Sequence, residues 1–260
     1  MNLTVLTENV AGGRFLAEHG LSYLIESDGQ KVLFDTGHSD VFIRNAQKLG
    51  IDIHKEISTV VLSHGHWDHG DGLQYLSNKT LIVHPSAFMK RYRKNDTSSL
   101  GLTMGKQELE QKFNLILSDK PYQVTSHLYF LGEIPRITDF EAQSTSFVDE
   151  YGNPDFVPDD SALAIIQDDQ LVIVTGCSHS GICNIIEYAK TVTGFNKIHS
   201  VIGGFHLKFK DRQTELTITY LKEQNIKNIY PSHCTELPAL TAFYEHFGIQ
   251  QLKTGNRLNL

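Results

Sequence analysis

Residues 62–72 read Leu-Ser-His-Gly-His-Trp-Asp-His-Gly-Asp-Gly and place three imidazoles and one carboxylate within six positions. The short apolar, β-branched run just before them predicts a buried strand that ends at this motif. Alternate side chains of an extended chain point the same way, so His64 and His66 can reach one metal ion together. If the chain then turns into a helix at Asp68, Asp68 and His69 point towards a second position nearby. Imidazole and carboxylate donors without a thiolate suit zinc, iron or manganese.

The composition of the whole chain limits the kinds of protein it can be. Its 260 residues are 40% hydrophobic, which is enough for a sizeable core, and carry a formal net charge of −7. An acidic chain disfavours nucleic-acid binding, and no apolar run approaches the roughly 18 residues that span a bilayer. The three cysteines lack the spacing of a disulfide framework, and the N-terminus lacks a signal-peptide pattern. Both observations predict a cytoplasmic protein. The short basic cluster Lys90–Lys94 is either a solvated turn or an anion-binding lid.

Strand and helix signals follow one another in both halves of the chain. An Asp-Gly turn at residues 28–29 joins two apolar runs, which predicts a hairpin. We therefore expect helices outside two mixed β-sheets that pack face to face. A single parallel, doubly wound sheet is the alternative, which the hairpin and the lack of a Gly-rich strand–helix turn disfavour. The expected strands are Leu3–Thr7, Ser22–Glu26, Lys31–Asp35, Thr59–Leu62, Thr80–Val83, Ala162–Ile166, Leu171–Thr175, His199–Ile202, Ile229–Pro231 and Gln251–Lys253, and the expected helices are 40–49, 106–113, 182–190, 212–223 and 237–247.

Residues 88–125 have the weakest periodicity in the chain. They contain the basic cluster, a Ser/Gly stretch at 97–101 and one plausible helix. A segment this long between core elements is often a lid or a substrate-facing insertion. We therefore expect a single domain over residues 1–260, with a lid or insertion around 88–125.

The motif resembles the mark of the metallo-β-lactamase superfamily, His-x-His-x-Asp-His after a buried strand. Asp35, in Phe-Asp-Thr-Gly-His at residues 34–38, resembles the aspartate that the family places at an earlier strand end. The segments 158–163, 175–181, 202–207 and 231–234 resemble one branch more closely, the dihydropteridine–ribofuranosyl-aminobenzene-phosphate synthase-like proteins. The resemblance covers the whole chain and implies a four-layer αββα sandwich of two mixed sheets. We do not transfer the substrate of that branch.

The resemblance also implies two divalent metal ions. Zinc fits best, and manganese and iron are the alternatives. One ion would take His64 and His66 with a third histidine from further along the chain. The second would take Asp68, His69 and His233, which ends a predicted strand where a C-terminal ligand belongs.

This sequence departs from the superfamily at the middle ligands. The usual Gly-His-Thr motif is absent, and the usual Gly-Asp at a strand end is Gly-Cys here, at Cys177. We predict His179 as the middle ligand and Cys177 as a weaker candidate, because small buried cysteines are common beside strand ends. The sequence supports two interpretations of His206 and Asp160 equally, as pocket residues or as structural ones. The remaining histidines are interpreted as structural or background, namely His84, His19, His54, His127, His199 and His246.

Such an ion pair lowers the pKa of water towards neutrality and polarises a carbonyl or phosphoryl oxygen. The leading hypothesis is a hydrolase that uses metal-activated hydroxide on an ester, phosphoester, lactone or amide bond of a small molecule. Asp68 would bind the ion and orient the hydroxide, His206 would protonate the leaving group, and Asp35 would fix a histidine tautomer. A phosphorylated substrate is favoured if Lys90–Lys94 folds over the pocket. The alternatives are a di-iron redox enzyme and a metal-containing binding protein with little turnover, and the sequence leaves the oligomeric state open.

Overall fold

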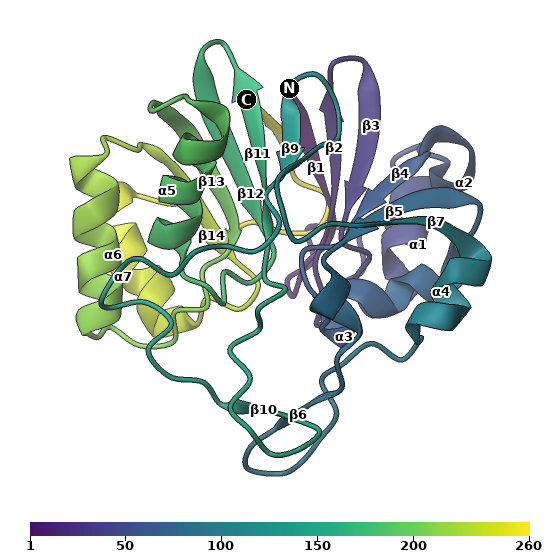
Figure 1. Cartoon of the computed structure of the whole chain (residues 1–260). Helices are drawn as coiled ribbons and strands as arrows, with labels where there is room; N and C mark the ends of the chain where they lie inside the picture. The colour runs from purple at the N-terminus through teal and green to yellow at the C-terminus, as the bar shows by residue number, and fades with distance from the viewer.

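Two mixed β-sheets form the centre of the computed structural model, which describes residues 1–260 (Figure 1). The seven-stranded sheet has the order β15-β1-β2-β3-β4-β5-β7, antiparallel from β15 to β3 and parallel from β3 to β7. The predicted hairpin joins β2 to β3 through Asp28 and Gly29, which both have positive φ. The strands of this sheet are β1 (Asn2–Thr7), β2 (Ser22–Ser27), β3 (Gln30–Phe34), β4 (Thr59–Val61), β5 (Lys79–Val83), β7 (Phe113–Leu117) and β15 (Arg257–Asn259).

The second sheet has six strands in the order β14-β13-β12-β11-β9-β8. It is parallel from β12 to β14 and antiparallel from β12 to β8, so the single parallel sheet considered as the alternative does not occur. Its strands are β8 (Tyr122–Gln123), β9 (Leu128–Phe130), β11 (Ala162–Gln167), β12 (Gln170–Thr175), β13 (Ile198–Gly204) and β14 (Asn228–Ser232).

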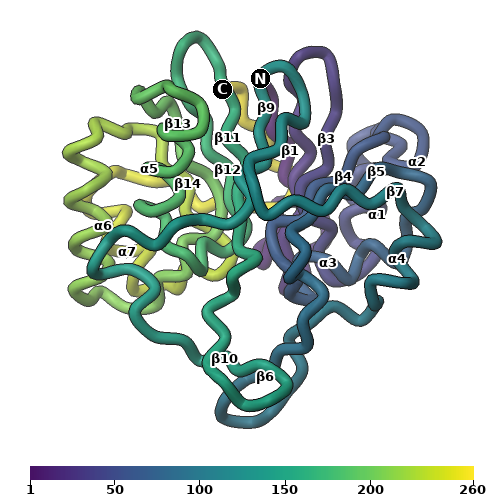
Figure 2. Tube along the Cα trace, in the orientation of Figure 1, coloured from purple at the N-terminus to yellow at the C-terminus, as the bar shows by residue number.

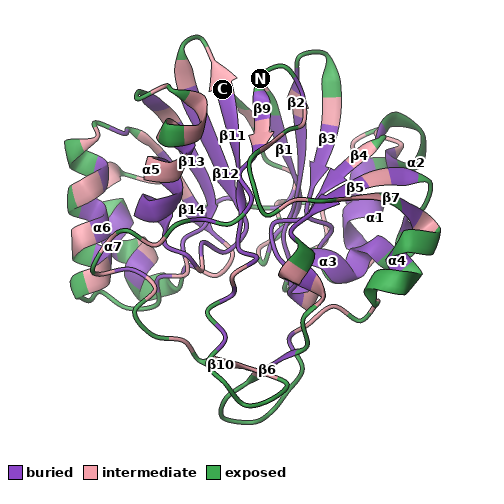
Figure 3. Ribbon diagram, in the orientation of Figure 1, coloured by how far each residue is buried: buried purple, intermediate pink, exposed green.

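The layers follow from the alternation of side chains along the strands. Ile25 of β2 and Ile165 of β11 belong to a core of 17 buried residues between the sheets. Leu24, one position along β2, belongs instead to a second core of 17 residues on the outer face of the seven-stranded sheet. A third core of 22 residues covers the outer face of the other sheet. The central strands of both sheets are accordingly mostly buried and the outward faces of the helices exposed, as Figure 3 shows. The predicted αββα sandwich of mixed sheets is confirmed.

Helices cover both outer faces of the sandwich. Asp211 caps α6 as predicted, since its carboxylate accepts a hydrogen bond from the backbone N–H of Thr214 at 3.1 Å. The predicted helix at 182–190 is three residues longer in the structure and ends at Gly194, which has φ of 78°. The helices on the seven-stranded side are α1 (Val41–Lys48), α2 (Ile53–Glu56), α3 (Trp67–Gly70) and α4 (Lys106–Lys112), with the 3-10 turns η1 (Asp71–Tyr75) and η2 (Pro85–Phe88); those on the other side are α5 (Ile182–Thr193), α6 (Arg212–Glu223) and α7 (Leu237–Phe247).

The predicted last strand, Gln251–Lys253, is wrong. Leu252 is buried between the sheets, which produced the apolar signal, but residues 251–253 have no strand partner. The chain turns at residues 253–256, where the backbone N–H of Asn256 donates to the carbonyl of Lys253 at 3.0 Å. Only after this turn does the chain pair with β1, so that the last strand is β15.

Residues 88–125 divide between two parts of the structure. Strand β6 (Arg91–Arg93) pairs with β10 (Phe147–Asp149), and the two form an arm that extends beyond both sheets (Figures 1 and 2). The later part, α4 and β7, belongs to the sandwich, because β7 pairs in parallel with β5. As an edge strand, β7 has one partner strand and only one buried residue, which explains its weak periodicity.

A buried ion-pair network holds the base of the arm. The side chain of Arg91 is fully buried, although the sequence placed it in a basic surface cluster. Its guanidinium lies 2.7 Å from an oxygen of Asp159 and 3.1 Å from an oxygen of Asp155, and both carboxylates are buried. Its neighbour Lys90 pairs with Glu150 at 3.6 Å. The positive charge of Arg91 is therefore matched inside the protein.

The two ends of the chain lie side by side, as the trace in Figure 2 shows. The amino group of Met1 donates a hydrogen bond to the carbonyl of Leu260 at 3.1 Å. None of the helices combines the length and apolar character needed to cross a membrane.

Arg91→Met is expected to lower the free energy of unfolding by about 3–5 kcal/mol, because it leaves two buried carboxylates without their cation. Urea unfolding monitored by circular dichroism measures the loss. Arg93→Met is the matched control, since Arg93 is on the same strand but exposed, and it should change stability by less than about 0.5 kcal/mol. Equal effects of the two substitutions would contradict the structural role of Arg91.

Candidate metal centre

The candidate residues gather at one edge of the sandwich. Side chains that follow parallel strands reach the same edge of a sheet, where open α/β sheets place their sites. The two sheets meet there through the backbone N–H of Ser161, which donates to the carbonyl of Ser63 at 3.0 Å. The residues at this edge are Asp35 after β3, the histidine motif after β4, Cys177 and His179 after β12, His206 after β13 and His233 after β14.

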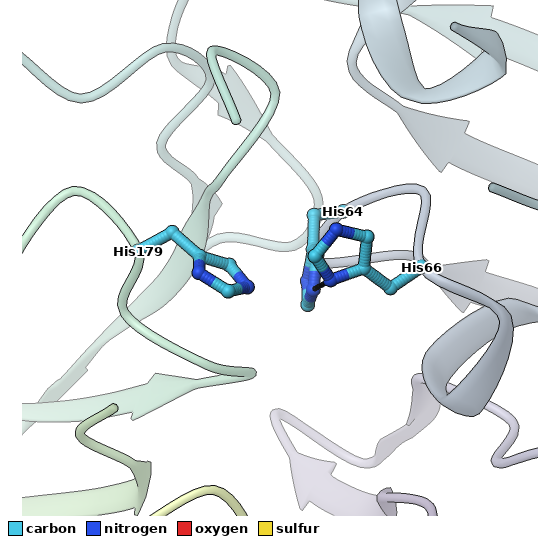
Figure 4. A group of neighbouring side chains, drawn as sticks. All are labelled: His64, His66 and His179. Atoms are coloured by element: carbon cyan, nitrogen blue, oxygen red, sulfur yellow. Dashed lines mark hydrogen bonds between the residues drawn. The ribbon is translucent and has the colours of Figure 1, made fainter. Parts of the chain in front are cut away.

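The first donor group consists of His64, His66 and His179 (Figure 4). Their ligand atoms all lie within 4.8 Å of one another. Nε2 of His64 is 3.0 Å from Nδ1 of His66, and the ring of His179 faces both from the opposite loop. The structure thus brings the two motif histidines together with the histidine predicted as the middle ligand.

The second donor group consists of Asp68, His69 and His233, whose ligand atoms also lie within 4.8 Å of one another. Oδ2 of Asp68 is 3.3 Å from Nε2 of His233 and 3.8 Å from Nε2 of His69. Helix α3 begins at Trp67, directly after His66, and this turn brings Asp68 and His69 to His233 at the predicted second position, while the ring of His69 also stays beside that of His64, with centroids 4.3 Å apart.

Cys177 lies between the two groups. Its sulfur is 3.2 Å from Nε2 of His69, and it forms a third set of donors with His64 and His69 within 4.8 Å. Burial raises the pKa of the thiol well above its ordinary value, and the neighbouring Cys234 adds to the shift. The cysteine therefore occupies the position from which one side chain could contact ions in both groups.

Buried ring nitrogens without partners provide a test of whether metal ions fit these residues. Nε2 of His66, of His179 and of His233 are buried and have no hydrogen-bond partner. Burial, followed by neighbouring histidines, lowers the pKa of His64, His66 and His179 well below the ordinary value, so these rings are neutral. An unsatisfied buried polar atom costs roughly 1–3 kcal/mol, and neutral imidazoles are zinc ligands. The donors present therefore fit divalent ions of the zinc type.

A buried carboxylate orients the second group from behind. Oδ2 of Asp35 is 2.7 Å from Nδ1 of His69 and accepts a hydrogen bond from the hydroxyl of Ser63 at 2.7 Å. Nδ1 of His69 therefore carries the hydrogen, and Nε2 keeps its lone pair for an ion. Burial disfavours the charged form of His69, but Asp68 and Asp35 together raise its pKa above the ordinary value. The predicted contact between Asp35 and a motif histidine is confirmed.

Two adjacent aspartates hold the backbone on both sides of the first group. Asp159 accepts a hydrogen bond at 2.7 Å from the N–H of Gly65, the residue between His64 and His66. Asp160 accepts one at 2.8 Å from the N–H of Ser180, next to His179. Burial raises the pKa of Asp160 to about 6, while Ser180 lowers it. Asp160 therefore supports the loop of His179 through one oxygen, while its other oxygen, Oδ1, is buried without a hydrogen-bond partner.

Gly65 allows the loop to pass close to its neighbour. A Cβ atom at this position would lie 1.8 Å from the carbonyl oxygen of Ala87, which no side chain tolerates. The need for glycine here comes from this close approach of two backbones, and not from a positive φ.

Four of the twelve non-glycine residues with positive φ lie at the centre. Asp35, Ser178, His206 and His233 all have φ between 51° and 57° although none of them is glycine. A non-glycine residue in this region costs of order 1 kcal/mol or more and persists only where surrounding contacts enforce it. Three of these four residues end strands at the edge where the donors gather.

His206 lies beside the first group and lines a cleft of about 240 Å³. Its ring centroid is 4.4 Å from that of His179, and burial, with Lys208 as the next cause, lowers its pKa to about 4. Phe147 of the arm forms another wall, with its ring 5.3 Å from His66 and 5.4 Å from His179. The structure thus makes His206 a pocket residue, one of the two interpretations that the sequence left open. Other residues that line the cleft are Phe156, Val157, Ser178, Lys208, Phe209 and Gln213.

The structure shows the contacts of two further histidines, His84 and His19. His84 was predicted to be structural, and its Nδ1 indeed accepts a hydrogen bond from the N–H of Ser86 at 3.1 Å. His19 was interpreted as background, but its Nε2 lies 3.3 Å from Oδ2 of Asp68. Neither the spacing nor the neighbours of His19 in the sequence carry a signal of this contact, which depends on tertiary structure alone.

Glu8 is a buried acid behind the second group. Its side chain is 1% exposed, and neither carboxylate oxygen has a hydrogen-bond partner. Burial raises its pKa to about 7, while the nearby backbone N–H groups of Asn9 and His233 lower it. Sequence analysis did not identify this residue, since a lone glutamate after a strand is usually exposed.

Comparison with known proteins identifies relatives over nearly the whole chain. The family model described as Metallo-beta-lactamase superfamily matches residues 17–192. The chain is 34% identical over 246 residues to an uncharacterized protein of Methanocaldococcus jannaschii, and the match covers 92% of each protein. It is 33% identical over 270 residues to the 7,8-dihydropterin-6-methyl-4-(beta-D-ribofuranosyl)-aminobenzene-5'-phosphate synthase of the same organism, covering 95% of this chain and 92% of that protein.

Solved structures show the same architecture. Tm1679, a metal-dependent hydrolase of the beta-lactamase superfamily, aligns with a TM-score of 0.89 at 31% identity, covering 100% of this chain and 99% of the other. A diphosphatase from the PhnP family aligns with a TM-score of 0.58 at 16% identity, covering 100% and 97%, and this likeness concerns the fold alone.

Asp160→Ala is expected to weaken binding of one of two metal ions by about 10–100-fold, because loss of an outer support loosens the loop that carries His179. Calorimetric titration of zinc into the ion-free protein measures this change. Asp139→Ala removes an exposed aspartate of the same half and should leave both affinities unchanged. Unchanged zinc binding in Asp160→Ala would show that Asp160 does not position His179.

Glu8→Gln is expected to stabilise the ion-free protein at alkaline pH. Folding raises the pKa of Glu8 from 4.5 to about 7, so stability present below pH 4.5 is lost as the pH rises through 7. The neutral amide avoids this loss, and the unfolding free energy of the variant should exceed that of the unaltered chain by roughly 2–3 kcal/mol at pH 8. Urea unfolding in EDTA at several pH values measures the difference, with Glu223→Gln as the exposed control. Parallel pH profiles for all three proteins would contradict the prediction.

Proposed function

The chain belongs to the metallo-β-lactamase superfamily, and from that premise we propose that it is a hydrolase dependent on two divalent metal ions. The bond it cleaves is an ester, phosphoester, lactone or amide bond of a small molecule. The observation that carries the proposal is the pair of buried donor groups joined through Cys177, with ring nitrogens that have no partner in the protein. Such an arrangement has a cost in stability unless it binds ions.

Seven side chains would hold the ions in this proposal. The first ion would be held by His64, His66 and His179, and the second by Asp68, His69 and His233, with Cys177 between them. Zinc suits this mixture of imidazole, carboxylate and sulfur donors better than manganese does, since manganese prefers oxygen ligands. When bound, the ions would lower the pKa of water and polarise the carbonyl or phosphoryl oxygen of the substrate.

The side chains around the donors have separate roles in this proposal. Asp68, held among three imidazoles, would orient the attacking water. Asp35 keeps His69 in the tautomer that leaves Nε2 free. His206 borders the cleft beside His179. With a pKa of about 4 it is neutral at pH 7, so in this proposal it would give a proton to the leaving group only once the negative charge that develops there raises its pKa. Phe147 packs against two of the donor rings and would exclude bulk water from that side.

The cleft supports a small substrate with an anionic portion. Its volume of about 240 Å³ is below the usual range for drug-sized ligands, roughly 300–1,000 Å³. Lys208 is the cation in its lining, whereas Arg91 is neutralised by buried carboxylates. If the substrate is phosphorylated, we therefore assign its recognition to Lys208 instead of the Lys90–Lys94 cluster.

The relatives are compatible with this proposal without determining the substrate. Tm1679 is described as a metal-dependent hydrolase, while the relative from Methanocaldococcus jannaschii is described as a synthase. The matched residues 17–192 include strands of both sheets, which supports the view that residues 1–260 act as one domain. Di-iron redox chemistry is the alternative enzyme class, and a sulfur donor between the two groups, in place of further carboxylates, makes it the weaker candidate.

The purified protein is expected to contain two zinc or manganese ions per chain, and His66→Ala is expected to lose the ion of the first group together with activity. Elemental analysis of both proteins, followed by assay with phosphodiester and lactone substrates, measures this. His54→Ala is the control, because His54 is an exposed histidine on α2, and it should retain both ions.

A chain that stays free of metal after exposure to zinc, manganese and iron would refute the proposal. Two iron ions with oxygen consumption would replace it by redox chemistry. Two ions with tight binding of a metabolite but without turnover would identify a binding protein.

A further inference from the structure

We propose that His19 is a positioning residue of the second donor group, which hydrogen-bonds the carboxylate of Asp68 and holds it towards His69 and His233. This inference rests on the proposed function, since it concerns how the second ion is held. His19 lies in the loop between β1 and β2, far in the sequence from the motif that it contacts.

The carboxylate of Asp68 is surrounded by imidazoles on more than one side. Nε2 of His19 is 3.3 Å from Oδ2 of Asp68, the same distance as that from Nε2 of His233. The pair is close enough for an ion-pair contact, and in the hydrogen bond that we propose Nε2 of His19 would carry the hydrogen, since a carboxylate oxygen only accepts. The atoms that lie within 4.8 Å of one another are those of Asp68, His69 and His233, without His19. His19 is therefore an outer partner of the carboxylate and not a ligand.

Packing keeps the imidazole of His19 in place even though its side chain is 55% exposed. Its ring stacks on that of His233, with centroids 5.4 Å apart and an angle of 26° between the planes. The ring also packs against Trp67 at 5.5 Å. Holding an exposed side chain in one rotamer costs conformational entropy. The contacts of His19 with Asp68, His233 and Trp67 offset that cost.

The backbone beside His19 is attached directly to the motif. The N–H of Leu21 donates to the carbonyl of Asp68 at 3.2 Å, and the carbonyl of Leu21 accepts from the N–H of Gly37 at 2.9 Å. At Gly20 a Cβ atom would lie 3.0 Å from the carbonyl oxygen of Asp68. These contacts hold the backbone next to His19 against the backbone of Asp68.

Orientation of Asp68 matters because its carboxylate lies between His233, at 3.3 Å, and His69, at 3.8 Å. The Asp68 side chain is 11% exposed, in contrast to the fully buried His69 and His233. Outer partners of ligating carboxylates typically contribute 10–100-fold to metal affinity or activity. His19 would supply for Asp68 what Asp35 supplies for His69.

His19→Leu and His19→Gln test the hydrogen bond itself. Leucine fills similar space without a donor, whereas the amide nitrogen of glutamine can donate at about the reach of Nε2. Calorimetric titration of zinc into the ion-free protein should show the second ion bound about 10–100-fold more weakly in His19→Leu, with the first ion unaffected. His19→Gln should stay within about 3-fold of the unaltered chain. With a substrate from the screen, kcat should fall in His19→Leu while KM changes little.

His38→Leu is the matched control. His38 is exposed and packs against the same tryptophan, with its ring 4.7 Å from that of Trp67, but it makes no contact with Asp68. It should bind both ions as the unaltered chain does. Unchanged affinity of the first ion in His19→Leu also shows that the variant is folded.

The outcomes separate this inference from the proposed function. Two ions of unchanged affinity in His19→Leu would overturn the role of His19 and leave the proposed function standing. Equal weakening in His19→Leu and His19→Gln would also overturn it, because the imidazole would then act by packing. An unaltered chain that binds no second ion would overturn both.

Discussion

The buried carboxylate of Asp35 is the contact on which the centre depends. It accepts hydrogen bonds from the backbone N–H and the hydroxyl of Ser63 and contacts Nδ1 of His69, each at 2.7 Å. The same hydroxyl lies 2.9 Å from Nδ1 of His64. One fully buried side chain therefore determines the rotation of a ring in each donor group. A buried charge is tolerated only when it is paired and hydrogen-bonded, and these contacts provide both.

The other aspartates extend the same arrangement across the sandwich. Asp159 and Asp160 lie at the start of β11 and accept from N–H groups on opposite sides of the first donor group. Each of these carboxylates thus accepts a hydrogen bond from a backbone N–H group, while Oδ1 of Asp160 and ring nitrogens of the donor histidines are left without partners. Asp159 and Asp160 thus orient the two loops that carry the donors of the first group. Neutral imidazoles and the carboxylate of Asp68 together form a donor set of the kind that holds a divalent cation.

Local and tertiary signals explain how much of this could be predicted. The motif at 64–69 lies within six positions after a strand, so the two donor directions follow from backbone geometry alone. His179 and His233 were predicted because the family resemblance implies a middle ligand and a C-terminal ligand, and the predicted strand that ends at His233 agrees with the second of these. His19 has no such marker, since a loop residue is brought to Asp68 only by pairing of β1 and β2 with the rest of the sheet. The prediction of a strand at Gln251–Lys253 failed for a related reason. Leu252 is buried in the core, and a buried apolar residue produces the same sequence signal whether or not its backbone pairs with a strand.

The arm joins the stability of the fold to the chemistry of the centre. Arg91 at its base binds Asp159, and Asp159 binds the N–H of Gly65 between two donors of the first group. On the facing strand, Phe147 packs against rings of the same group. A displacement of the arm would therefore move a wall of the cleft and strain the loop of the first ion at the same time. The second donor group is contacted instead by His19 from the loop between β1 and β2, and Asp35 reaches both groups, directly at His69 and through Ser63 at His64. An arm adapted to a new substrate would change the first group before the second.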